Sequence, residues 1–262
     1  MSSTLSYVFC LVRSARRPTP RGLGEGMPGG RNLRSIEVGA DLWAIVESVP
    51  EDQYGEMALA TGLQNLDWVG PRAIVHERVI ESFLSATALL PMQLFTLFTS
   101  DDRVVQHVRS DRARIARILK RIEKQVEWGL RLTWDEKAAL EKIDRKHASR
   151  PRGADLSGPQ GVEYLARKRD VLDVSRKGLV DARAAADRMY KAMGRQATAS
   201  QRRTSMERAA PGSRLLLDAA FLVPVPRSSA FRSAIRQHAR ELRTTGVAVT
   251  LTGPWPAYNF IQ

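Results

Sequence analysis

The sequence predicts an α+β protein with two small sheets, each covered by helices. Apolar segments of strand length occur near both ends of the 262-residue chain, and a long helical region lies between them. Strands and helices do not alternate steadily, as they do in the βαβ units of a parallel sheet. With 43% hydrophobic residues, the chain is long enough to form one large core or two small ones.

The strands are expected from runs of apolar residues and from alternation. Residues 5–12 are apolar on both faces, which is typical of a central strand. Residues 126–134 alternate most clearly, because every even-numbered residue is Val, Trp or Leu. The expected strands are residues 5–12, 33–38, 41–49, 89–98, 126–134, 215–225 and 247–251.

The helices are expected from apolar residues three and four positions apart. Residues 99–102 (TSDD) supply capping side chains for a helix over residues 102–124. A seam of three and four spacing follows in residues 161–208, formed by Leu172, Ser175, Leu179, Ala182, Ala186, Met189 and Met193. Because small residues occupy several of these positions, we expect this helix to pack on its own domain. The expected helices are residues 66–87, 102–124, 135–147, 161–208 and 228–243.

The bulk composition indicates a cytoplasmic protein without membrane insertion. No apolar run reaches the ~20 residues of a membrane-spanning helix, and residues 1–10 lack the order of a signal peptide. The one cysteine, Cys10, lies within an apolar run and excludes an internal disulfide. We therefore expect Cys10 to be a buried, inert thiol.

The net charge of +13 is concentrated in the middle of the chain. Residues 101–210 hold 27 Lys and Arg against 16 Asp and Glu. Such a field could attract nucleic acid, an anionic surface or an acidic partner, although interleaved acids favour a solvated helical face. Residues 135–210 contain only Tyr164 and Tyr190 as aromatic residues, which argues against a stacking platform for nucleic acid. A basic nucleic-acid-binding or general scaffold protein remains the alternative function.

No motif in the sequence indicates catalysis. The glycine-rich residues 22–30 lack the Lys-Ser/Thr ending of a P-loop, and no serine-hydrolase, zinc-protease or paired CxxC motif occurs. We therefore expect no enzyme, no cofactor, no metal site and no small-molecule substrate.

Two groups of ionisable residues were candidates for a site. We expect His76 to lie at the edge of an apolar helix face, and Glu123 and Glu127 to lie on the surface. A hydrolase using Cys10 or His76 is a third class of function, and it would require a polar cleft with an acidic partner.

Four blocks of sequence, taken in order, carry a resemblance to a known family. They are residues 76–81 (HERVIE) leading into 89–92 (LLPM), residues 127–131 (EWGLR), residues 161–169 (GVEYLARKR) and the tail 253–260 (GPWPAYNF). Together they resemble the GvpL/GvpF family of gas-vesicle proteins over nearly the whole chain. The chain departs from the family pattern at residues 93–96 (QLFT), where the family has Arg-Phe-Gly-Thr, and at Ala257, where it has proline.

The resemblance implies an accessory role in building gas vesicles, the protein-walled compartments that give cells buoyancy. Family members are thought to bind the small hydrophobic shell protein and other accessory proteins during nucleation or assembly. The implied location is the cytoplasm and the gas vesicle. The implied fold has two α+β domains, the first ferredoxin-like. We expect domains at residues 1–110 and 111–252, the second containing the long helices, and a tail at residues 253–262.

The tail is the candidate site for interaction or domain docking. Pro254 and Pro256 fix their own φ angles and restrict the residues before them, so the segment loses little entropy when it is ordered. Trp255, Tyr258 and Phe260 offer large contact areas. The tail could bind a partner, but we favour docking onto the protein's own body.

Overall fold

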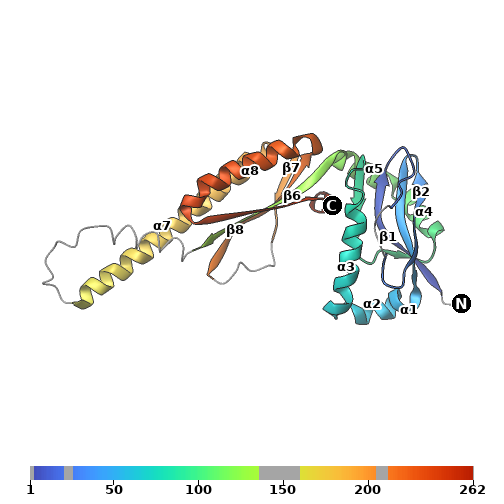
Figure 1. Ribbon diagram of the computed structural model, residues 1–262, viewed down its shortest axis with the longest axis horizontal. Helices are drawn as coiled ribbons and strands as arrows, with labels where there is room; N and C mark the ends of the chain where they lie inside the picture. Colours follow the sequence, from blue (N-terminus) through green and yellow to red (C-terminus); the bar gives the residue numbers. More distant parts are fainter. Residues whose placement is uncertain (1–2, 21–25, 136–159, 205–211, 262) are drawn as a thin grey trace. The chain divides into compact units, whose positions relative to one another are not determined.

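The computed structural model describes residues 3–20, 26–135, 160–204 and 212–261, and these fold as mixed helix and sheet, which confirms the α+β prediction (Figure 1). The chain divides into two compact units. Unit 1 comprises Met1–Glu127 and Pro254–Gln262, and unit 2 comprises Trp128–Gly253. These limits differ from the predicted domains, 1–110, 111–252 and 253–262. The helix after residue 110 packs on the first sheet, and the tail belongs to unit 1.

Unit 1 is built on an antiparallel sheet of five strands. They are β1 (Thr4–Arg13), β2 (Arg31–Gly39), β3 (Leu42–Pro50), β4 (Ala88–Pro91) and β5 (Leu97–Phe98), with β1 between β3 and β4. As expected for a central strand, β1 is buried on both faces. The single strand predicted at residues 89–98 is wrong, because a turn interrupts it. The Thr96 amide donates to the Gln93 carbonyl there, and Phe95 has a positive φ of 63°.

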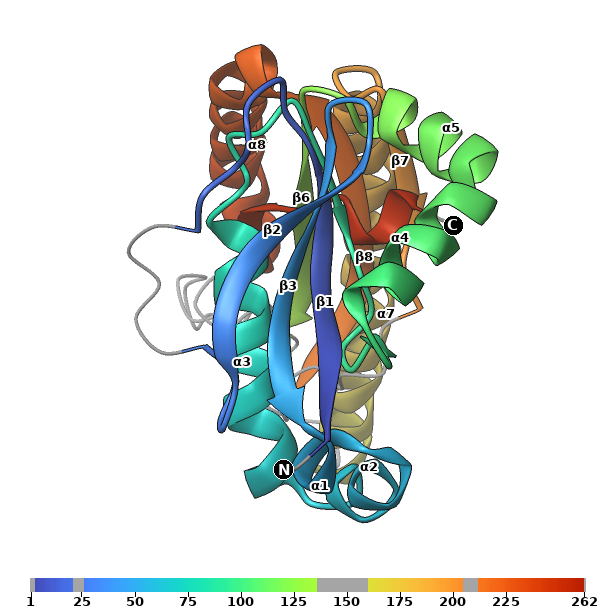
Figure 2. The same cartoon turned by 90° about the vertical axis from the view of Figure 1, so that its right-hand side faces the viewer.

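Helices cover both faces of this sheet. They are α1 (Glu51–Tyr54), α2 (Glu56–Gly62), α3 (Leu66–Glu81), α4 (Asp101–Ser110) and α5 (Arg112–Ile122). The inner side of α3 joins Tyr7 and Phe9 of β1 in one apolar cluster, whereas α4 contacts β2 and α5 contacts β4 on the other side of the sheet (Figure 2). The helix α3 continues through Pro71 but ends at Glu81 rather than at residue 87. The helix predicted at 102–124 is two helices, divided at Asp111.

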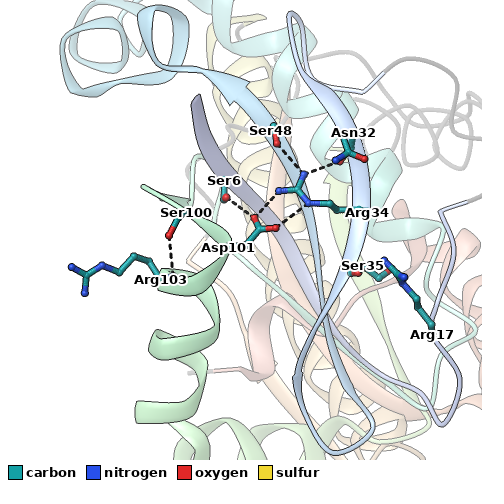
Figure 3. Close-up of polar contacts among 9 residues, drawn as sticks. All are labelled: Ser6, Arg17, Asn32, Arg34, Ser35, Ser48, Ser100, Asp101 and Arg103. Carbon is teal, nitrogen blue, oxygen red and sulfur yellow. Dashed lines mark hydrogen bonds and ion pairs between the residues drawn. The ribbon is translucent and has the colours of Figure 1, made fainter. Parts of the chain in front are cut away.

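An ion pair fastens the start of α4 to the sheet. The Arg34 guanidinium donates to both carboxylate oxygens of Asp101, at 3.0 and 2.6 Å, and Ser6 Oγ donates to the same carboxylate at 2.7 Å (Figure 3). Arg34 also donates to Ser48 Oγ at 3.0 Å. As predicted from the capping residues, the Ser100 hydroxyl accepts from the Arg103 amide at the helix N-terminus.

The glycine-rich loop before β2 holds a carboxylate of the protein itself. The Glu47 side chain accepts from the Met27 amide at 2.9 Å and is buried. A Cβ atom at Gly26 or Gly30 would overlap this carboxylate, so a side chain at either position would have to displace the Glu47 carboxylate. A ferredoxin-like domain has a β-α-β-β-α-β order. The described residues between β1 and β2 contain no helix, so the ferredoxin-like assignment stays a prediction.

Unit 2 contains a four-stranded sheet and two long helices. The sheet order is β7 (Ala199–Arg202), β8 (Ser213–Pro224), β6 (Gln125–Asp135) and β9 (Val247–Trp255). The helix α7 (Gln160–Gly194) contacts β8 and α8 (Ser228–Leu242). The described part of the predicted α7 seam is mostly buried, as expected for packing on its own unit.

Two helices were predicted in this region, over residues 135–147 and 161–208. The predicted helix at 135–147 lies almost wholly outside the described residues. The helix predicted at 161–208 extends too far, since α7 ends at Gly194 and β7 follows. The short sequence of β7 is polar and lacks strand alternation. It forms a strand because it pairs with β8, from Ala199 opposite Leu222 to Arg202 opposite Ala219.

Candidate binding site at the C-terminal tail

The C-terminal tail lies against unit 1. After β9 the chain turns at Pro256 and Ala257, and Tyr258–Phe260 form one turn of 3-10 helix. Pro256, Ala257 and Phe260 are buried. The tail is therefore an ordered part of the fold.

One polar contact of the tail is made with a buried carboxylate. Glu127, at the start of β6, is only 2% exposed. The Asn259 backbone amide donates to Glu127 Oε2 at 2.8 Å, and the Asn259 side-chain amide donates to Oε1 at 2.6 Å. A buried carboxylate needs such donors, because its desolvation is costly. The expectation that Glu127 lies on the surface is thus wrong, whereas Glu123 is exposed as expected.

A second carboxylate contacts the tail from α3. The Tyr258 hydroxyl donates to Glu77 Oε2 at 2.5 Å. Burial, followed by this bond to the Glu77 carboxylate, raises the pKa of the Tyr258 phenol. Burial and the Glu77 charge also raise the pKa of Glu81, one helical turn away. The hydroxyl of Tyr258 therefore keeps its proton and donates it in the hydrogen bond to the Glu77 carboxylate.

Next to this contact, His76 joins α3 to the turn between β4 and β5. Its Nε2 atom lies 3.2 Å from the Met92 carbonyl, which can only accept, so Nε2 carries the proton. Its Nδ1 atom then accepts from the Tyr7 hydroxyl at 2.8 Å, and that hydroxyl accepts from the Phe95 amide. Burial lowers the pKa of His76 to about 4, so the imidazole is neutral at physiological pH.

This network leaves His76 without a nitrogen available as a general base. His76 was predicted at the edge of an apolar helix face, and it lies deeper, because the residue is 2% exposed and its ring packs against both Tyr7 and Phe9. Cys10 is fully buried in the same region, and burial raises the pKa of its thiol, as expected for an inert cysteine. Neither residue supports the hydrolase hypothesis.

A cavity of about 350 Å³ opens beside the tail. His76, Glu77 and Gln93 contribute polar groups, while the rest of the wall is mainly apolar. Its wall joins α3, the β4–β5 turn and the tail, through Ala73, Pro91, Met92, Leu94, Tyr258 and Ile261. A cavity of this size accommodates a side chain or a small part of a partner.

The five predicted tail residues differ in their surroundings. Pro256 and Phe260 are buried, and Tyr258 is half-buried at its bond to Glu77. Pro254 and Trp255 face solvent, and Trp255 is 36% exposed. Most of the apolar area of the tail is thus used within unit 1, and Trp255 is its main exposed ring.

The sequence did not identify as site residues the tail's polar partners, Glu77 and Glu127, or the tail's own donor, Asn259. Alternation along residues 126–134 assigns Glu127 to the polar face of a strand and cannot reveal its burial. A signal was nevertheless present. Glu77 and Glu127 lie in the first and second blocks of the family resemblance, and both contact the fourth block. The third block lies on α7, among residues whose side chains are not described.

Among the described residues, no three His, Cys, Asp or Glu side chains gather in a way that could hold a metal ion. No helix within the described ranges has the length and apolar character needed to cross a bilayer.

Comparison with known proteins gives one consistent result. The sequence profile described as "Gas vesicle synthesis protein GvpL/GvpF" matches residues 5–262. Gas vesicle protein L of Streptomyces sp. (strain CB03234) is 29% identical over 259 residues, which cover 98% of this chain and 92% of that protein.

Two solved structures share the fold. The gas vesicle protein GvpF of Anabaena sp. PCC7120 has a TM-score of 0.67 at 15% identity, with 99% of this chain and 97% of that chain covered. GvpF of Microcystis aeruginosa has a TM-score of 0.62 at 15% identity, with both chains covered completely.

Proposed function

Because this chain belongs to the GvpL/GvpF family of gas vesicle synthesis proteins, we propose that it is an accessory protein that binds the small hydrophobic shell protein during vesicle assembly. Its role is in the gas-vesicle system. Within that system, the proposed partners of the protein are the shell subunit and other accessory proteins. A shell subunit must expose apolar surface before it assembles, and such surface aggregates unless a partner covers it.

The observation that carries this proposal is exposed apolar surface on unit 1. Met57, Leu63, Leu66 and Ile74 are large apolar side chains on α2, on α3 and in the turn between them, and all four are mostly exposed. Together they are called the α2–α3 face below. Core packing does not account for these side chains, whereas a partner with exposed apolar residues would.

For the tail we propose docking as its main role. Asn259 and Tyr258 satisfy two carboxylates of unit 1, and Phe260 fills an apolar site. The tail thereby stabilises the unit that carries the α2–α3 face. Trp255 remains a candidate contact for a partner, because a third of its surface is exposed.

A co-expression pull-down tests both parts of the proposal. The tagged protein should retain the small shell protein, and a variant lacking residues 253–262 should have a lower melting temperature. If the full-length protein retains no shell protein, the binding function is wrong. If the shortened protein keeps both its melting temperature and its binding, the tail has no role in either.

A second candidate function is supported by the surface of α5. A groove of about 300 Å³ there is lined by Arg114, Arg117, Ile118 and Arg121. Its guanidinium groups, of which that of Arg114 is paired with Asp111, would attract an anionic surface or nucleic acid. However, α5 contains no aromatic residue on which bases could stack. Binding of a DNA or RNA oligonucleotide at two salt concentrations tests this alternative, since phosphate contacts weaken steeply with salt.

A further inference from the structure

We propose that the α2–α3 face binds an amphipathic helix whose apolar side is flanked by lysine or arginine. This inference rests on the proposed function, under which that helix belongs to the shell subunit. Three independent features of residues 51–81 support it: the shape of α3, its exposed apolar side chains and its charge.

The shape comes from the spacing along α3. Leu66 and Ile74 are eight residues apart, so they lie on the same side of the helix with Gly70 between them. A Cβ atom at Gly70 would meet nothing within 4 Å, so the space above this residue is open. Leu66 and Ile74 therefore lie on either side of this open position, which is called the notch below, about 12 Å apart along the helix axis at 1.5 Å per residue. Such a notch suits the side chain of a second helix, inserted between the two apolar residues.

The apolar side chains of this face are not needed for the core of unit 1. Leu66 is 84% exposed and Ile74 is 66% exposed. The opposite side of α3 supplies the core, through Val75 and Val79. The helix is thus apolar on two sides, although a surface helix needs only one apolar side for folding. The outer side is available for a partner.

The charge of this segment is opposite to that of the whole chain. Residues 51–81 contain six carboxylates and two arginines, a net charge of −4, in a chain of net charge +13. Among the described residues, none of the six carboxylates forms an ion pair. One of the two arginines, Arg72, is buried against Trp68, with its Cζ atom 3.9 Å from the ring centroid. The exposed charged residues of this segment, called its rim below, are therefore four acids, Glu51, Asp52, Glu56 and Asp67, and one cation, Arg78.

The negative charge of this segment favours some partners of an apolar face over others. Exposed carboxylates at Glu56 and Asp67 repel nucleic acid and anionic lipid surfaces, and they attract a cationic flank. A second copy of α1–α3 would bring two acidic rims together and is disfavoured for the same reason. An apolar helix with lysine or arginine beside its apolar side complements both the notch and the rim.

Pull-down experiments with the co-expressed shell protein separate the apolar and the acidic contributions. The first variant, Leu66→Gln with Ile74→Gln, removes the apolar contact and keeps the charge. The second, Glu56→Gln with Asp67→Asn, removes two acids and keeps the apolar contact. The control is Val180→Gln on α7, where the side chain is 59% exposed in unit 2.

The proposal makes a distinct forecast for each variant. The apolar variant should retain about tenfold less shell protein, as expected for the loss of central contacts. The acidic variant should bind more weakly and lose less binding at high salt. The control should bind as the wild type does. Circular dichroism and melting curves verify that each variant is folded. If the wild type binds and the apolar variant binds equally well, the face is wrong while the proposed function stands. If the wild type retains no shell protein, the proposed function itself is overturned.

A peptide titration tests the chemistry of the partner without the shell protein. The probes are two synthetic 18-residue amphipathic helices with the same leucine side, one flanked by lysine and the other by glutamate. In isothermal titration with the full chain, the lysine peptide should bind at least about tenfold more tightly, and Leu66→Gln with Ile74→Gln should remove most of that binding. Equal binding of the two peptides, or binding unaffected by the variant, would overturn the inference.

Discussion

The contact between Asn259 and Glu127 provides a sharp test of how the tail is held. The change is Asn259→Asp, which replaces the side-chain amide 2.6 Å from Glu127 Oε1 by a carboxylate. Two carboxylates would then face each other where Glu127 is 2% exposed. The change removes a hydrogen bond to a charged group, typically worth about 1.5–3 kcal/mol, and repulsion between the two buried carboxylates adds to this loss. Removal of the donor alone, in Asn259→Ala, should cost about 1.5–3 kcal/mol.

The reciprocal exchange should restore the contact. In Glu127→Gln combined with Asn259→Asp, the new amide can donate to the new carboxylate, and the backbone amide of residue 259 can still donate to the amide oxygen. The double variant should therefore be more stable than the sum of the single changes predicts, by about 2 kcal/mol or more. Gln64→Asp is a matched control, because it adds the same charge at an exposed position of unit 1.

Hydrogen exchange of the C-terminal peptide measures the stability of the tail contact directly, because release of the tail is a local opening. In Asn259→Ala, exchange of residues 254–262 should be faster by roughly tenfold to a hundredfold, which corresponds to the expected loss of free energy. Thermal melting gives the effect on unit 1 as a whole. The reasoning is refuted if Asn259→Asp exchanges as slowly as the wild type, or if the double variant shows only the sum of the two single effects.

Three further changes test other parts of unit 1. Because the folded protein favours neutral His76, the stability that His76 contributes is complete above pH 6.5 and is lost as the pH falls towards 4. In His76→Gln, the free energy of unfolding should therefore fall by about 2.5 kcal/mol less than in the wild type between pH 7 and 4.5. Parallel curves of unfolding free energy against pH, measured by urea titration, would contradict this. Arg34→Met should lower the free energy of unfolding in urea by about 1–2 kcal/mol. Adding Asp101→Asn should lower it little further, because both changes remove the same half-buried ion pair. Fully additive losses of unfolding free energy would contradict this. Burial raises the pKa of Glu47, so ionisation of Glu47 destabilises the fold as the pH rises. The melting temperature of Glu47→Gln, relative to that of the wild type, should therefore increase from pH 5 to 8. A difference in melting temperature that shrinks as the pH rises would contradict this.

Much of the fold was predictable from local patterns. The apolar run at residues 5–12 predicted a central strand because both of its faces meet core, and Ser100 was recognisable as a helix cap. Errors arose where distant parts of the chain decide the local structure. The polar residues of β7 form a strand only because β8 lies beside them, and the run at 89–98 is broken where Phe95 takes a positive φ.

The candidate site was predictable only in part, for a related reason. The prolines and aromatic rings of the tail marked it as an ordered contact segment, since their effect on entropy and contact area is local. The partners of the tail were not visible. Glu127 has a polar side chain in a strand with a regular alternation, and nothing within that strand reveals that a residue 132 positions away supplies its donors.

By itself, the sequence determined the class of fold, the inert state of Cys10 and membership of the gas-vesicle family, because these depend on residue types and on their order. Only the tertiary structure decided that the tail belongs to unit 1, where Glu77 and Glu127 require donors that Tyr258 and Asn259 provide. It also decided which apolar residues of α3 are left outside the core. Burial depends on what the rest of the chain brings to each position, and a side chain's own chemistry does not contain that information.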